Sequence, residues 1–168
     1  MAASGDPRIK AWAKTVPKGE AKALMERVLA EAARSGSQVM VLDGAMVFGA
    51  DHLTSALAHA EKASAEGRNA SDSLAMETLL YASGERQLSS AIKKMGVGPE
   101  TTEVVVAVVS GPFSPGEGWT GLPDRCAAPD RARLARFGVT EKEMSTVDQG
   151  RLSELVLEKV AAVDVIKK

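Results

Sequence analysis

Residues 69–96 read NASDSLAMETLLYASGERQLSSAIKKMG, and this stretch carries the clearest helical pattern in the chain. Asn69, Ser71 and Ser73 are candidate N-caps, because short polar side chains accept hydrogen bonds from the amides of a first helical turn. Gly84 predicts the end of this helix, since glycine adopts the left-handed conformation at little cost. The stretch therefore predicts two short helices joined by a glycine hinge.

The apolar residues of the second helix follow the spacing of a single helix face, i, i+3, i+4 and i+7. They are Leu88, Ala91, Ile92 and Met95, and Gly96 follows them as a stop. We therefore expect one face of this helix to lie in the core.

Polar residues accompany this apolar pattern and allow two interpretations. Glu77 and Tyr81 are four residues apart, so they lie side by side on the first helix. Arg86, Gln87 and Lys93 begin and line the outer side of the second helix. These are either ordinary solvated residues of two surface helices or a binding surface gathered around the turn between them.

Outward from this stretch, hydrophobic patterns predict the other elements of the fold. Strands are expected at 11–16, 38–43 and 101–110, and helices at 20–33, 51–65, 130–137 and 148–166. We predict a single α/β (α+β) domain over 1–168, with a small mixed or antiparallel sheet packed with about five to seven helices. Residues 1–8 are expected to fray, and 110–129 to form a long loop.

Local signals refine these boundaries. The Asp43-Gly44 pair is typical of a hairpin turn leading into Met46, Val47 and Phe48. Asp51 is a candidate cap for the helix that ends near Ala65. Thr140 and Glu143 have the spacing of a capping box. The segment 110–129 is long for a loop in a compact domain, and loops of that length are usually mobile or functional. We expect Trp119 to fasten this loop to the body of the protein.

Composition limits the possible function classes. The 168 residues contain 21 Lys plus Arg and 22 Asp plus Glu, a formal charge of −1, so contact with nucleic acid would require a local patch. Cys126 is the only cysteine, and the sequence begins without the pattern of a signal peptide, which predicts a cytoplasmic protein. The apolar run Val104–Val109 is too short to cross a membrane.

Catalytic and metal-binding motifs provide no support for an enzyme. The chain lacks a nucleophile elbow, it lacks a phosphate-binding loop with its lysine, and it lacks paired cysteines. We therefore expect no catalytic residues and no cofactor. His52 and His59 are separated by roughly 10 Å along a helix, which is too far to share one metal ion. We expect His52 to pack or hydrogen-bond locally at the start of its helix.

The final helix has a wide apolar arc of roughly 160°, more than one core-facing stripe requires. The arc contains Leu152, Leu155, Val156, Val160, Ala162, Val163 and Ile166, and Lys159 lies inside it. Either the Lys159 stem extends along the core, or part of the arc contacts a partner protein.

The central motif resembles a known family. The run SLAMETLLYASGERQL at 73–88, with Gly96 behind it, is similar to the signature of the TPRKB family, the small kinase-binding subunit of the KEOPS complex. GADHL at 49–53 and LSELVLEKVA at 152–161 resemble the same family, although the loop at 110–129 is longer than the family's. The resemblance implies a non-catalytic subunit of the assembly that places threonylcarbamoyl groups on the adenosine next to the anticodon of tRNAs that read ANN codons.

The resemblance also implies two partners and no small-molecule substrate: the amino lobe of the complex's kinase-like ATPase, and the single-stranded CCA tail of tRNA. An unpaired tail is read by stacking and hydrogen bonding while cations hold its phosphates. For the tail we assign Tyr81 as a stacking ring, Asn69, Glu77, Ser83 and Gln87 as base or ribose partners, Lys62, Arg68, Arg86, Lys93 and Lys94 as phosphate contacts, and Gly84 as a turn that the RNA backbone approaches.

For the kinase contact we assign Leu152, Leu155, Val156 and Lys159. The alternative function is an adaptor or regulator of the kinase subunit that binds protein only and makes no direct contact with RNA. A small-molecule enzyme, the third class, would show ligand-dependent thermal stabilisation without a partner.

Overall fold

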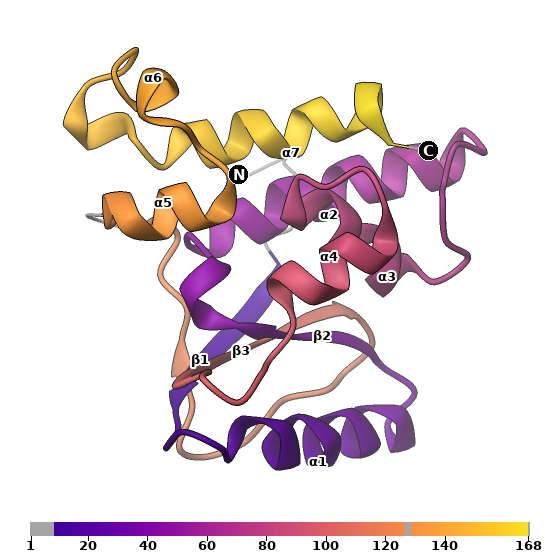
Figure 1. Cartoon of the computed structure of the whole chain (residues 1–168). Coiled ribbons are helices and arrows are strands. Elements are labelled where there is room, and N and C mark those ends of the chain that lie inside the picture. Colours follow the sequence, from indigo (N-terminus) through magenta and orange to yellow (C-terminus); the bar gives the residue numbers. More distant parts are fainter. Residues whose placement is uncertain (1–8, 127–128, 168) are drawn as a thin grey trace, which may run out of the picture.

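A four-stranded antiparallel sheet, in the order β2-β3-β1-β4, lies at the centre of the computed structural model, which describes residues 9–126 and 129–167 (Figure 1). The strands are β1 (Lys10–Thr15), β2 (Gln38–Asp43), β3 (Glu103–Ser110) and β4 (Thr120–Gly121). β3 pairs with both β1 and β2, and its residues from Val104 to Val109 are all buried. This explains the continuous valine-rich run, because a strand covered on both faces has no solvent side.

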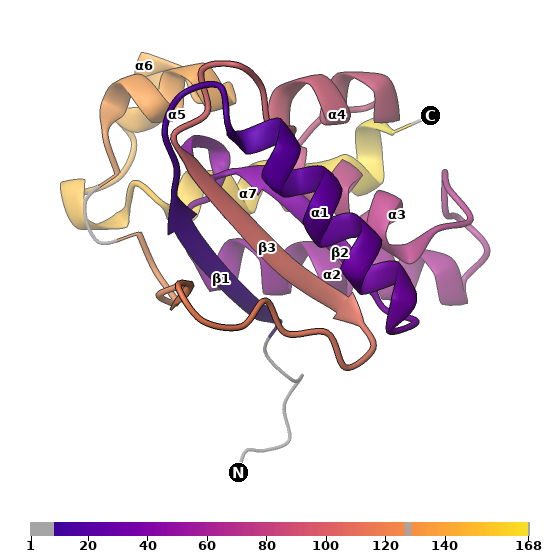
Figure 2. The same ribbon diagram turned by 90° about the horizontal axis from the view of Figure 1, so that it is seen from below.

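Helices cover both faces of the sheet. α1 (Ala21–Arg34) packs alone on one face, as Figure 2 shows, and its buried residues meet Val104 and Val106 of β3. The other face is covered by α2 (Ala50–Ala65), α3 (Leu74–Ser83) and α4 (Leu88–Met95) (Figure 1). Val105 and Ala107 point into this larger core, since successive strand residues alternate between faces.

The C-terminal part of the chain adds three helices. They are α5 (Arg131–Phe137), α6 (Glu141–Met144) and α7 (Glu154–Ile166), and α7 packs against α2 and α3. Seven α-helices are therefore present in the described part of the chain. This mixed α+β single domain confirms the predicted fold class, and the capping box of Thr140 and Glu143 is present as predicted.

Three local predictions are wrong. The Asp43-Gly44 pair does not form a hairpin: an Asp43 carboxylate oxygen accepts from the Ala45 amide and begins a 3-10 helix, Gly44–Met46. The N-cap of α2 is Gly49, with φ 102°, and Asp51 lies in the first turn instead. The last helix is also broken near its start, by a 3-10 turn at Gln149–Arg151.

The predicted loop at 110–129 contains the short strand β4, which pairs with β1 through Trp12 and Ala13. Trp119 packs against the core under α1, and Lys14 Nζ lies 5.8 Å from the centre of its ring. These contacts confirm that Trp119 fastens the loop to the body of the protein. The predicted fraying of 1–8 lies outside the described residues.

Candidate binding surface around α3 and α4

The α3–α4 pair forms as the sequence predicts. Ser73 is the N-cap of α3, and its hydroxyl accepts from the Met76 amide at 3.2 Å. Gly84 ends α3 in the left-handed conformation, with φ 71°, and Gly96 ends α4. A glycine hinge thus joins α3, which is almost completely buried, to α4.

Glu77 of α3 is buried, with none of its surface exposed. Its carboxylate accepts from the Ala70 and Ser71 amides, each at 2.9 Å, and its second oxygen lies 2.7 Å from Lys167 Nζ. Burial by itself would lower the pKa of Lys167, but hydrogen bonds to Glu77 and Tyr81 outweigh it and raise that pKa. Glu77 therefore fastens the loop before α3 to the end of the chain after α7.

Tyr81 is also fully buried, one turn further along α3. Its ring stacks on His59 of α2, with centroids 5.5 Å apart and planes 17° apart, and its hydroxyl donates to the Asp164 carboxylate of α7. Burial, and then the hydrogen bond to Asp164, raises the pKa of Tyr81. Arg68 adds an ion pair with Asp164 at 3.2 Å. This network ties α2, α3 and α7 together.

The Gly84 turn packs against other helices. A Cβ atom at Gly84 would lie 3.2 Å from Lys159 Cβ and 3.7 Å from the Phe137 ring. Lys94 Nζ donates to the Ser83 carbonyl at 2.6 Å and to Glu85 at 3.1 Å, and it lies 3.9 Å from the Phe137 ring centre. Burial lowers the pKa of Lys94. The lysine neutralises the carbonyl end of α3.

His52 packs and hydrogen-bonds near the start of α2, as predicted. Its Nδ1 accepts from the Phe48 amide at 3.1 Å, so Nε2 carries the proton and donates to the Ala82 carbonyl at 2.7 Å. Burial lowers the pKa of His52 to about 4. A neutral imidazole therefore links α2 to α3 at physiological pH.

Burial changes the set of residues that can contact RNA. Glu77, Tyr81 and Ser83 are fully buried, so Tyr81 offers no face for stacking, and the other two offer no atoms to a base or ribose in this conformation. Lys94 is directed to the Ser83 carbonyl, and the Gly84 backbone faces α7. Sequence patterns missed this because the partners of these residues lie on distant segments.

Other predicted residues do lie at the surface. Arg86, Gln87 and Lys93 are exposed at the start of α4 and along it, and the described residues form no ion pair with Arg86 or Lys93. Lys62, exposed near the end of α2, and Arg68, which is paired with Glu66, form a second group. Asn69 is half-buried, and its amide donates to the Ser71 carbonyl.

The inner face of α7 is core. Leu155 and Val156 of α7, and Leu152 just before it, are 3%, 0% and 1% exposed, so they cannot contact a partner protein as predicted. Lys159 Nζ pairs with Glu143 at 2.7 Å. The outward face of α7 is nevertheless apolar over its last two turns: Ala161 and Ala162 are exposed, and Val165 and Ile166 are 86% and 41% exposed.

Similarity to a known family covers most of this fold. A model of the family described as kinase binding protein CGI-121 matches residues 18–124, which is more than half of the chain. The chain belongs to the CGI-121 family. The match confirms the resemblance to the TPRKB family, and it includes the α3–α4 pair, whereas α5, α6 and α7 follow it. No curated protein matched the chain in a separate search.

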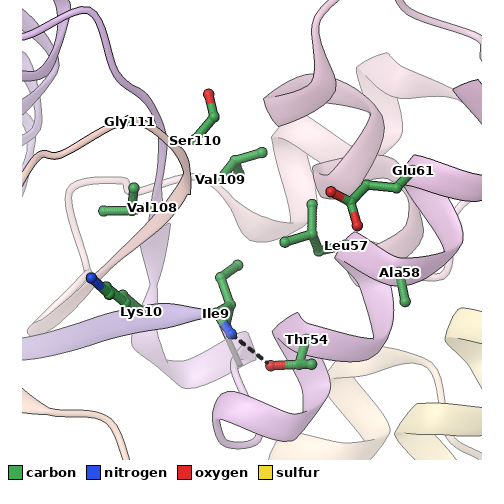
Figure 3. A pocket seen from close by; sticks show the side chains of 10 residues that line it. All are labelled: Ile9, Lys10, Thr54, Leu57, Ala58, Glu61, Val108, Val109, Ser110 and Gly111. Atoms are coloured by element: carbon green, nitrogen blue, oxygen red, sulfur yellow. Dashed lines mark hydrogen bonds between the residues drawn. The ribbon is translucent and has the colours of Figure 1, made fainter. Parts of the chain in front are cut away.

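The CGI-121 domain also contains a cleft between α2 and the ends of β1 and β3. It has a volume of about 220 Å³, and the Ile9 amide donates to the Thr54 hydroxyl at its margin (Figure 3). Lys10 and Glu61 line opposite sides of the cleft in Figure 3.

Two further findings concern the described part of the CGI-121 domain. Within residues 9–126 and 129–167, no group of three His, Cys, Asp or Glu side chains could hold a metal ion. None of the described helices is long and apolar enough to cross a membrane.

Proposed function

We propose that this CGI-121 domain is a non-catalytic subunit of the KEOPS complex. In this role it binds the amino lobe of the kinase-like ATPase subunit in the cytoplasm and recruits tRNA through its single-stranded CCA tail. The match to a family of kinase-binding proteins carries the proposal. Most side chains of α3 are buried, so the α3–α4 motif supports the fold, and the exposed residues around it are the ones available for binding.

The outward face of α7 is the proposed kinase contact. Ala161, Ala162, Val165 and Ile166 form an exposed apolar patch, and such patches on monomeric proteins commonly mark interaction sites. The buried pair of Glu77 and Lys167 holds the end of α7 in place. A rigid apolar face loses little conformational freedom on binding, which favours affinity.

The proposed tRNA contact is the exposed group Arg86, Gln87 and Lys93, with Lys62 further away. Two exposed cations that form no ion pair with a described residue suit phosphates, and an exposed amide can read the edge of an unpaired base. Without Tyr81 as a stacking ring, the affinity depends mainly on charge. We therefore expect modest tRNA affinity that decreases strongly with salt.

Co-elution with the purified kinase-like ATPase subunit on a sizing column tests the kinase assignment. We expect one complex at micromolar concentrations. Separate elution of the two proteins at those concentrations would contradict the proposal.

A titration of the pure protein with intact and CCA-trimmed tRNA tests the RNA assignment. We expect trimming to weaken binding, and Arg86→Ala with Lys93→Ala to reduce the salt slope by about 0.7 for each phosphate that the protein no longer neutralises. Glu117→Ala, which changes an exposed charge on the loop before β4, is the control. Equal affinity for both tRNAs would exclude capture of the tail.

The second candidate function is a protein-only adaptor of the kinase subunit. It is favoured by the burial of Glu77, Tyr81 and Ser83, which removes three of the residues assigned to RNA. Kinase binding without any detectable tRNA binding would establish this alternative.

A further inference from the structure

An apolar groove lies beside β2, between α1 and the α3–α4 pair. Its cavity volume is about 250 Å³. Met25 and Leu29 of α1 form one wall, and Ala75, Met76, Leu79 and Ile92 of α3 and α4 form the other. In Figure 1, β2 runs between α1 on one side and α3 and α4 on the other. Leu29 and Ile92 are 42% and 46% exposed, so the groove opens to solvent between them.

The floor of the groove is the outer edge of β2. Val39, Met40, Val41 and Leu42 all line it, although successive side chains of a strand point to opposite faces. One wall comes from α1 and the other from helices on the opposite face of the sheet, so the cavity lies along the strand edge. β2 is the terminal strand of the sheet, and no described residue forms a backbone hydrogen bond with its outer edge. Such an edge is a template for another strand.

Positive charge lies beyond one end of the groove. A neighbouring cleft shares Met25 with it and continues to Val97 and Lys22. Lys22 is exposed and forms no ion pair with a described residue, including Glu26 one turn further along α1. A ligand that follows the groove toward Lys22 would therefore meet its exposed ammonium group.

We propose that this groove binds an extended, apolar segment of a partner protein as an added strand on β2, with an acidic residue at the end next to Lys22. An added strand sends alternate side chains toward α1 and toward α3 and α4. Both walls are apolar, so the segment should be apolar at consecutive positions. Met25 and Met76 are flexible enough to fit side chains of different shape. This inference depends on neither the α7 contact nor the tRNA contact.

Selection from a displayed library of nine-residue peptides on the full chain tests this inference. We expect enrichment of peptides that combine a run of Val, Ile, Leu or Phe with a terminal Asp or Glu. In fluorescence anisotropy, Leu29→Lys and Ile92→Lys should weaken the best peptide tenfold or more, because each places a charge at the apolar mouth. Val165→Lys, which changes an equally exposed apolar residue on α7, should leave the affinity unchanged.

Backbone chemistry distinguishes an added strand from other forms of binding. N-methylation of alternate peptide amides should abolish binding for the set that faces β2 and preserve it for the other set. Lys22→Glu should weaken peptides with an acidic end and strengthen analogues that carry lysine there. These two results together would establish strand addition next to Lys22.

Several results would overturn the inference. They are a selection without enrichment, equal peptide binding by wild type and Ile92→Lys, or indifference to both sets of N-methylated amides. Displacement of the peptide by a CCA-ended oligonucleotide would assign the groove to nucleic acid instead. Self-association that Ile92→Lys removes would assign it to a second copy of the chain.

Discussion

His52 shows how burial fixes the state of a single residue. Its ring accepts from the Phe48 amide and donates to the Ala82 carbonyl, so the neutral tautomer satisfies both partners. The protonated form would lose the first hydrogen bond and bury a charge, which explains the low pKa of about 4. The sequence indicated a local packing role for His52, but the Ala82 carbonyl lies on another helix and could not be predicted.

Stability should therefore decrease in mild acid. A histidine in the unfolded chain titrates near 6.5. As the pH decreases from 6.5 toward 4, the unfolded chain therefore binds a proton at this residue before the folded protein does. We expect His52 to account for a loss of about 2 kcal/mol in the free energy of unfolding between pH 7.5 and pH 5. Urea denaturation of wild type and His52→Gln measures this contribution. Identical pH dependence in the two proteins would contradict the buried neutral state.

The ion pair of Glu77 and Lys167 gives a second prediction at this scale. The two side chains are 0% and 7% exposed, so Lys167→Met leaves a buried carboxylate without its cation. We expect a loss of about 3 kcal/mol in the free energy of unfolding, measured by urea denaturation. Arg151→Met breaks the exposed pair with Glu154 and should leave the free energy of unfolding nearly unchanged. A similar small effect for both variants would show that Lys167 contributes little.

This pair also marks the limit of sequence analysis. Glu77 has the pattern of an outward-facing helical residue, and nothing nearby in the sequence shows that a lysine 90 positions away neutralises it. The same applies to Tyr81, whose partner Asp164 lies on α7. Long-range pairing decided which polar residues are buried, and with it which can contact RNA.

Among the helices and strands, the features that depend on neighbouring residues alone could be predicted from the sequence. Ser73, Gly84 and the capping box of Thr140 were predicted because a cap depends on a few neighbouring residues. The Asp43-Gly44 hairpin failed because β2 pairs with β3 across the sheet and not with the next segment. The apolar arc predicted for the last helix has a buried part and an exposed part, and periodicity could not show which part faces α2 and α3.

Substitution of Gly84 tests the conformation of the hinge between α3 and α4. Gly84→Ala forces a side chain into a left-handed backbone and adds a Cβ atom 3.2 Å from Lys159 Cβ. Gly36 has a similar φ of 76° but nothing within 4 Å, so Gly36→Ala isolates the backbone cost. We expect losses of about 1 kcal/mol for Gly36→Ala and about 2 kcal/mol for Gly84→Ala in thermal or urea unfolding. Equal losses would show that the turn can move away from α7.

In the whole molecule, one set of polar residues is buried and stabilises the fold, and another set is exposed and available for binding. Buried polar residues of the α3–α4 motif tie α2, α3 and α7 together, which leaves binding to the exposed residues around them. The fold class could be predicted because apolar patterns fix the number and type of elements. Strand order and the free edge of β2 could not, since they depend on pairing between segments far apart in the chain.

The outward face of α7 is the site that we propose for the kinase-like ATPase subunit. Isothermal titration calorimetry of the purified subunit with wild type, Val165→Glu and Leu29→Glu tests it most directly. We predict that Val165→Glu weakens binding at least tenfold, which corresponds to about 1.4 kcal/mol, while Leu29→Glu binds like wild type. Unchanged affinity of Val165→Glu, or a weakening confined to Leu29→Glu, would contradict the account.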